Sequence, residues 1–136
     1  MQHLKIFTDG GSRGNPGEAA IGAIILDDED GTKITEISKK IGIATNNVAE
    51  YSAVLESLEY VEKNIGKSQI EFILDSELVV RQLCGLYKVK DQKLKALFNQ
   101  INKKIISVGG QCQFTAVKRE KNIEADALVN KALDGK

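Results

Sequence analysis

Four acidic side chains stand where the sequence predicts that a strand ends or a helix lies. Asp9 and Asp75 each follow a short apolar stretch, and Glu50 and Asp126 lie in amphipathic segments. If the four carboxylates met, they would repel one another by roughly 1 to 4 kcal/mol per pair, so they would take up protons or cations. Mg²⁺ prefers such oxygen ligands, and two ions together can hydrolyse a phosphodiester without a His or Cys nucleophile. The acids therefore favour metal-dependent nucleic-acid cleavage.

The periodicity of apolar residues predicts the elements that would position these acids. The predicted fold class is α/β, with the element order β-β-β-α-β-α-α-β-α, in which helices pack on a mixed sheet. A Gly-rich loop is expected at residues 9–17, directly after the first strand. The predicted strands are residues 4–8, 19–26, a stretch containing Ile34, Ile37 and Ile41, 70–74 and 111–117, and the predicted helices are 47–63, 76–83, 91–106 and one from about Asn122.

This order suggests how the acids could meet. Asp9 and Asp75 are both expected at the carboxyl ends of strands, where open sheets bind their ligands. If the first and fourth strands are parallel neighbours, these two carboxylates come close together. Glu50 falls just beside the apolar stripe of its helix, so the first and last helices could each bring one more acid to the same point.

Length and composition narrow the classes of protein to which this chain can belong. The chain has 136 residues, 42% of them hydrophobic, so we expect a single domain over residues 1–136. Basic and acidic residues balance at 19 each, so no global positive field draws the protein to nucleic acid. Cys84 and Cys112 lack zinc-site spacing and are expected to be buried, reduced thiols.

The first residues and the hydropathy of the sequence indicate where in the cell the protein is expected. The first residues, Met1 to Lys5, lack the apolar core of a signal peptide, and no stretch approaches the roughly 20 apolar residues of a membrane span. We therefore expect a soluble, cytoplasmic, monomeric protein without a membrane partner. His3 has no partner motif and is expected at the surface.

The residues around the acids resemble the type 1 ribonucleases H. The resemblance runs from Met1 to about Leu133 and rests on TDGGSRGNPG at residues 8–17, TNNVAEY at 45–51, Asp75-Ser76, and NIEAD at 122–126. It implies a ribonuclease H-like fold, with a five-stranded mixed sheet whose first three strands are antiparallel and with about four flanking helices.

The resemblance also implies an activity and a role for each acid. The protein would be an endonuclease that hydrolyses the RNA strand of RNA/DNA hybrids and leaves 5′-phosphate and 3′-hydroxyl ends. Two Mg²⁺ ions would complete the site with the substrate, and Mn²⁺ would substitute for them. Asp9 would bridge both ions, Asp126 would hold the ion that activates water, and Glu50 with Asp75 would hold the ion at the leaving oxygen.

The substrate contacts that the resemblance implies lie in the same motifs. They would reach the backbone and sugars in the minor groove, where the RNA 2′-hydroxyl can both donate and accept hydrogen bonds. A basic loop at residues 118–121 adds Arg119 as a candidate for contact with a phosphate. The candidate substrate-binding residues are Gly10, Gly11, Ser12, Asn15, Thr45, Asn46, Asn47, Arg119 and Asn122.

The sequence departs from the family pattern at two places. Many members carry a His in the loop before the last acid, whereas here no His follows His3, and Arg119 is the residue that could replace it without shuttling protons. A basic protrusion is replaced by the short connection 85–90, for which Lys88, Lys90, Lys93 and Lys95 could partly compensate. This compact form resembles archaeal and some bacterial members, in which double-stranded RNA is a further substrate.

Several alternatives stay open at this point. Asp9, Asp75 and Asp126 could each simply end a strand, start a turn or complement a helix dipole. Thr45, Asn46 or Asn47 is available to cap the helix that follows, so either asparagine could have this role and not a role in binding. The protein could also be another nuclease of the same fold that acts on double-stranded RNA or DNA junctions, or a non-catalytic nucleic-acid-binding module.

Overall fold

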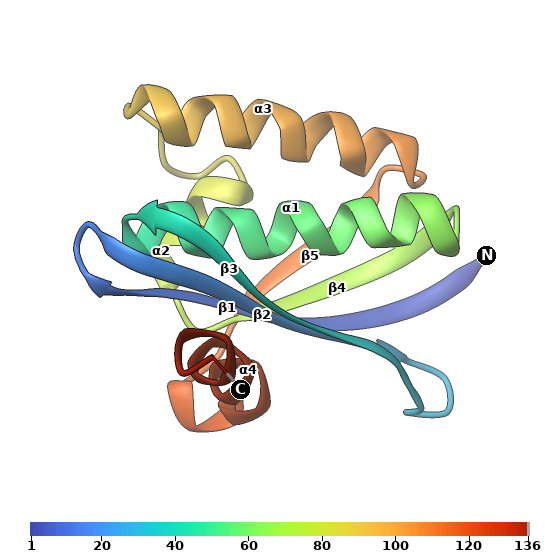
Figure 1. Cartoon of the computed structure of the whole chain (residues 1–136). Helices are drawn as coiled ribbons and strands as arrows, with labels where there is room; N and C mark the ends of the chain where they lie inside the picture. Colours follow the sequence, from blue (N-terminus) through green and yellow to red (C-terminus); the bar gives the residue numbers. More distant parts are fainter. Residues whose placement is uncertain (136) are drawn as a thin grey trace.

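Five strands and four α-helices follow one another in the predicted order in this computed structural model, which describes residues 1–135 (Figure 1). A short 3-10 helix, η1, precedes the last helix. The elements are β1 (Gln2–Gly14), β2 (Gly17–Asp27), β3 (Lys33–Ala44), α1 (Asn46–Asn64), β4 (Ser68–Leu74), α2 (Glu77–Leu83), α3 (Gln92–Ser107), β5 (Gln111–Ala116), η1 (Arg119–Lys121) and α4 (Ile123–Leu133).

The strands form one mixed sheet in the order β3-β2-β1-β4-β5. The strands β1, β2 and β3 are antiparallel neighbours, whereas β4 runs parallel to β1 and β5 runs parallel to β4. The predicted five-stranded mixed sheet, with its first three strands antiparallel, is confirmed, and the condition under which Asp9 and Asp75 would meet is fulfilled, because β1 and β4 are parallel neighbours. Because β1 lies at the centre of the sheet, its side chains can meet elements on both faces.

The helices divide unequally between the two faces of the sheet (Figure 1). Helix α1 lies on one face, and α3 packs against α1 as an outer layer. Helix α4 lies on the opposite face, over β1, β2 and β3. The large hydrophobic core is on the α1 side, whereas the cluster under α4 consists of Ala20, Val129 and Leu133 with the partly buried Ala132. The last helix is therefore held by far less apolar surface than the first.

The prediction of a loop at residues 9–17 is wrong, because β1 continues to Gly14. This stretch pairs with β2, in a register that places Asp9 opposite Gly22 and Gly14 opposite Gly17. Asp9 therefore lies inside its strand rather than at the carboxyl end. The parallel pairing with β4 does stop earlier, at Phe7 opposite Ile73, so Asp9 still lies just beyond that ladder.

The two thiols differ in exposure. Cys84 forms the C-cap of α2 and is exposed, so the prediction that it is buried is wrong. Cys112 lies in β5, where burial raises the pKa of its thiol to about 11. Neither residue forms a disulfide. Among residues 1–135, no helix combines the length and the apolar character that crossing a membrane requires.

Candidate active site

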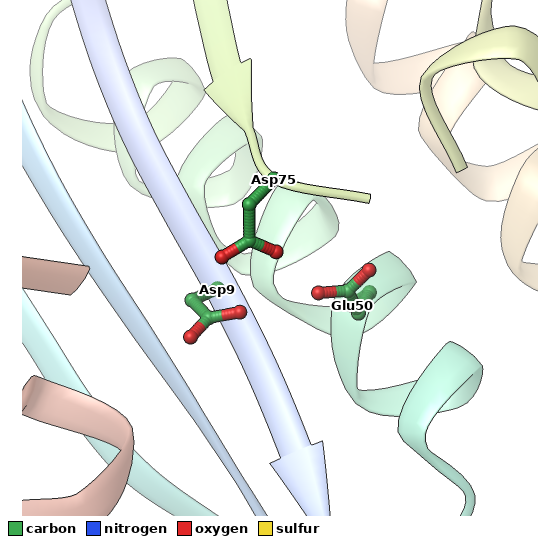
Figure 2. Close-up of side chains that lie close together, drawn as sticks. All are labelled: Asp9, Glu50 and Asp75. Carbon is green, nitrogen blue, oxygen red and sulfur yellow. The ribbon is translucent and has the colours of Figure 1, made fainter. Parts of the chain in front are cut away.

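Three of the four predicted acids converge at the edge of the parallel β1–β4 pair. Asp9 comes from β1, Asp75 directly follows β4, and Glu50 lies in the second turn of α1 (Figure 2). Each offers a carboxylate oxygen, and these oxygens all lie within 4.8 Å of one another. Asp75 stands two residues after Ile73, as Asp9 stands two residues after Phe7, so the strand register itself aligns the two aspartates.

Two glycines allow the helices to approach β1 and β2 closely. A Cβ atom at Gly10 would overlap the backbone of Ala49 and Glu50, so the missing side chain lets α1 lie directly on β1. On the other face, a Cβ at Gly22 would overlap the backbone oxygen of Ala125 in α4. Gly10 is predicted above as a substrate contact, and the structure gives it a packing role. Gly22 is missed by the sequence analysis, although an isolated Gly in an apolar strand often marks such a close approach.

The geometry concentrates negative charge in a poorly solvated place. Asp9 and Glu50 are each 8% exposed. Burial, together with the charges of Asp75 and Glu50, raises the pKa of Asp9 to about 9. Burial and the charge of Asp75 likewise raise the pKa of Glu50 to about 7, although hydrogen bonds with Asp9, Ser76 and the backbone N–H of Gly10 partly oppose this. Without a cation, the cluster would therefore retain protons near neutral pH.

The fourth predicted acid, Asp126, reaches the cluster from the opposite face. It lies in the first turn of α4, and hydrogen bonding with its carboxylate is among the causes that raise the pKa of Asp9. Asn122 precedes this helix, and its Nδ2 donates to the backbone oxygen of Thr8 over 2.8 Å. Since Asn122 is only 1% exposed, this structure gives it a positioning role, although the sequence analysis assigns it to the substrate.

The residues fit a divalent metal ion. All donors are carboxylate oxygens, which Mg²⁺ and Mn²⁺ prefer to nitrogen or sulfur. The Oδ2 atom of Asp75 is buried and has no hydrogen-bond partner, so it has an unused lone pair at the cluster. A cation there would also relieve the repulsion that raises the two pKa values.

Three of the predicted substrate contacts hydrogen-bond to one another beside the turn between β1 and β2. The Oδ1 atom of Asn46 accepts from the backbone N–H of Ser12 at 2.8 Å and from its hydroxyl at 3.1 Å. The backbone N–H of Asn46 donates to Oδ1 of Asn15 at 3.1 Å. These bonds engage both Oδ1 atoms, so the amide groups of Asn15 and Asn46 keep their NH₂ donors for an external acceptor.

The cap of α1 is Thr45, whose side chain accepts from the N–H of Val48. The alternative that Asn46 or Asn47 caps the helix is therefore wrong, and both belong to the first turn of α1. Gly11 is partly exposed on β1, with Val129 of α4 as its nearest neighbour.

The basic residues that are candidates for contact with the substrate all lie on the surface. Arg119 is exposed in η1, three residues before Asn122, and the described part of the chain gives it no ion pair. The lysines that could compensate for the shortened connection are also exposed: Lys88, Lys90, Lys93 and Lys95. His3 is exposed as predicted.

Comparisons with known proteins agree with this geometry. A family model described as reverse transcriptase-like matches residues 7–132. Ribonuclease HI of Halobacterium salinarum is 40% identical over 129 residues, which cover 94% of this chain and 63% of that protein. A bifunctional protein of Mycobacterium tuberculosis is also 40% identical over 129 residues, which cover 95% of this chain but 35% of that protein. A ribonuclease H of Clostridium botulinum is 30% identical, covering 98% of this chain and 97% of its own.

Solved structures give the same result. LC11-RNase H1, isolated from compost by a metagenomic approach, has 44% sequence identity and a TM-score of 0.92, with 99% of this chain and 98% of that chain covered. The same enzyme in complex with an RNA/DNA hybrid has 43% identity and a TM-score of 0.91, covering 97% of each chain. The chain thus belongs to the type 1 ribonuclease H family, whose members use divalent metal ions. It spans only about a third of the mycobacterial relatives and under two thirds of the halobacterial one.

Proposed function

We propose that the protein is an endonuclease that hydrolyses the RNA strand of RNA/DNA hybrids with two Mg²⁺ ions. The observation that carries this proposal is the convergence of Asp9, Glu50 and Asp75 within 4.8 Å, with Asp126 close enough to Asp9 to contribute to its raised pKa. Support for the hybrid as substrate comes from LC11-RNase H1, which resembles this chain closely and has been solved with an RNA/DNA hybrid.

The four carboxylates would together bind the two metal ions. Asp9 is in contact with the other three acids, which suits it to hold both ions. Asp126 comes from α4, whereas Glu50 comes from α1 and Asp75 from the end of β4, so Asp126 would hold one ion and Glu50 with Asp75 would hold the other. Bound Mg²⁺ would supply an activated water on one side of the phosphodiester and positive charge at the departing oxygen on the other. The products would carry 5′-phosphate and 3′-hydroxyl ends.

The chain's own residues would bind the duplex and exclude wrong substrates. The free NH₂ donors of Asn15 and Asn46 are held in place by the hydrogen bonds around Ser12, so they suit the acceptor oxygens of sugars and bases in a minor groove. Arg119 is exposed close to the start of α4, where its guanidinium could hold a phosphate. With 19 basic and 19 acidic residues, the protein depends on such local contacts for its affinity.

A substrate panel tests this function. The full chain would be mixed with RNA/DNA hybrid, double-stranded RNA, duplex DNA and a DNA junction, in Mg²⁺ and separately in Mn²⁺, and the product ends would be analysed. We expect cleavage of the hybrid's RNA strand in either ion and no cleavage by the Asp9→Asn variant. Preferential cleavage of duplex DNA or junctions, or full activity of Asp9→Asn, would overturn the proposal. Cleavage of double-stranded RNA in addition would extend the substrate range.

A further inference from the structure

A buried hydrogen bond joins α1, the helix that carries Glu50, to α2, the helix that follows Asp75. The hydroxyl of Tyr51 donates to Oε1 of Gln82 over 2.6 Å. Tyr51 is fully buried and Gln82 is 9% exposed, so neither group has free access to solvent. A buried polar pair of this kind is costly when one partner is lost, because the other remains without a hydrogen bond.

The position of Tyr51 connects this bond to the metal ligands. Tyr51 follows Glu50 in α1, and successive helical residues point about 100° apart. One helical turn therefore directs Glu50 towards Asp9 and Asp75 and Tyr51 towards α2. A shift of this turn would move both side chains together.

The chain also links α2 directly to Asp75. Only Asp75 and Ser76 separate the end of β4 from the first residue of α2. Ser76 caps α2 by accepting from the N–H of Val79, so the residue that follows Asp75 is bound to the first turn of this helix. The conformation of Asp75 therefore depends on where α2 lies. Helix α2 also buries Val79, Val80 and Leu83 in the core, and the Tyr51 bond adds a directional contact to this apolar packing.

We infer that Tyr51 is a positioning residue for the metal site: its hydrogen bond to Gln82 helps to fix the orientation of α2, and thereby holds Asp75 beside Glu50 and Asp9. The inference rests on the proposed function for its kinetic readout and goes beyond it in assigning a residue that touches neither metal nor substrate. Tyr51 acts only through α2.

The first test uses Tyr51→Phe, which removes one hydroxyl and keeps the ring in the core. We expect the metal concentration for half-maximal hybrid cleavage to rise about 3- to 10-fold, the size of one hydrogen bond, with KM for the hybrid unchanged. The Mn²⁺ affinity measured by calorimetry without substrate should fall by a similar factor. Tyr60→Phe is the matched control, because Tyr60 lies in the same helix farther from the acids, and it should leave both values unchanged.

A second variant separates positioning from general stability. In Tyr51→Phe/Gln82→Met an apolar pair replaces the hydrogen bond, so the Tm should recover, while the metal requirement should stay raised because the directional link is gone. An unchanged metal requirement in Tyr51→Phe, or its full recovery in the double variant, would overturn the inference. If the wild-type protein cleaved no duplex, the proposed function would fail, but the calorimetric comparison would still test the role of Tyr51.

Discussion

The side-chain amide of Asn122 holds the backbone oxygen of Thr8 at 2.8 Å, and so joins the start of α4 to the strand that carries Asp9. Both residues are 1% exposed. Helix α4 also buries Ala125, Leu128, Val129 and Leu133, but at its N-terminus, where Asp126 lies, the described residues give it no side-chain cap, so the Asn122 bond is a direct link between this end of the helix and β1.

Replacing Asn122 by Ala should therefore affect both stability and catalysis. The Thr8 oxygen would lose its buried donor, which costs roughly 1 to 3 kcal/mol of unfolding free energy. The displacement of Asp126 should lower kcat more than it raises KM. Urea unfolding and steady-state cleavage would measure the two effects. Lys131→Ala, an exposed change in the same helix, is the control. Wild-type stability in Asn122→Ala would contradict this account.

The raised pKa of Asp9 predicts how stability depends on pH without metal. A carboxyl whose pKa is higher in the folded than in the unfolded state binds more protons when folded, so stability is greatest near the unfolded value of about 4 and falls as pH rises. With a folded pKa of about 9, the decline should run from about pH 5 towards pH 9 in a chelator. Asp9→Asn should flatten this profile and be more stable than wild type at pH 8, by about 1 kcal/mol or more.

Chemical denaturation at a series of pH values would measure this profile. Glu29→Gln, an exposed change in the turn between β2 and β3, should leave the slope as it is in the wild type. If the stability of the metal-free wild-type protein rose steadily from pH 5 to pH 9, repulsion among the buried carboxylates would not destabilise the folded state, and this account would be wrong.

Divalent ions should reverse the same repulsion. A ligand that binds only the folded state raises its stability by about 2.7 kcal/mol at 100 times the dissociation constant. We therefore expect Mg²⁺ or Mn²⁺ to raise the Tm of the wild type in a concentration-dependent way and to affect Asp9→Asn much less. Ca²⁺ tests whether any oxygen-binding cation suffices for stability. Equal shifts in wild type and Asp9→Asn would place the ions elsewhere.

Gly10 and Gly11 should respond differently to substitution by Ala. A methyl group at Gly10 would collide with the backbone of α1, and overpacking of this kind costs roughly 1 to 3 kcal/mol. At Gly11 the added Cβ would lie 3.6 Å from Cγ1 of Val129, an ordinary contact, so stability should change by less than about 0.5 kcal/mol. Thermal and urea unfolding of the two variants would compare them directly, and equal losses would refute the role assigned to Gly10.

Asn46 should matter for binding more than for the chemical step. Asn46→Ala removes a donor expected to face the duplex and the acceptor that orders Ser12, so KM for the hybrid should rise about 5-fold or more. The kcat value should change little, because the carboxylates are untouched. Asn64→Ala, at the other end of α1, is the matched control. A fall in kcat alone would indicate that Asn46 aligns the reacting phosphate instead.

The sequence predicted the order of the elements, because this follows from the period of apolar residues, whereas the pairing that brings Asp9 to Asp75 entered only as a condition, because periodicity does not determine which strands are neighbours. It also placed Glu50 beside the apolar stripe of α1, where the structure buries it. What failed was the interpretation of the glycines near Asp9 as a loop. Their local preference for turns was overridden by pairing with β2, and the need for glycine came from helices that are distant in sequence.

The roles of Asn122 and Tyr51 could not be predicted for a similar reason. A buried hydrogen bond between residues 114 positions apart, as for Asn122 and Thr8, leaves no periodic signal in either segment. Tyr51 simply continued the apolar stripe of its helix, and nothing in its neighbours indicated that its hydroxyl meets Gln82.

The uneven covering of the sheet has a consequence for how the site assembles. Local unfolding free energy is smallest where little apolar surface is buried, and α4 rests on a small cluster while α1 lies in the main core. We therefore expect the helix that carries Asp126 to open more readily than α1, the helix that carries Glu50. Opening of α4 would separate Asp126 from the other three acids, which the main core and the sheet hold together.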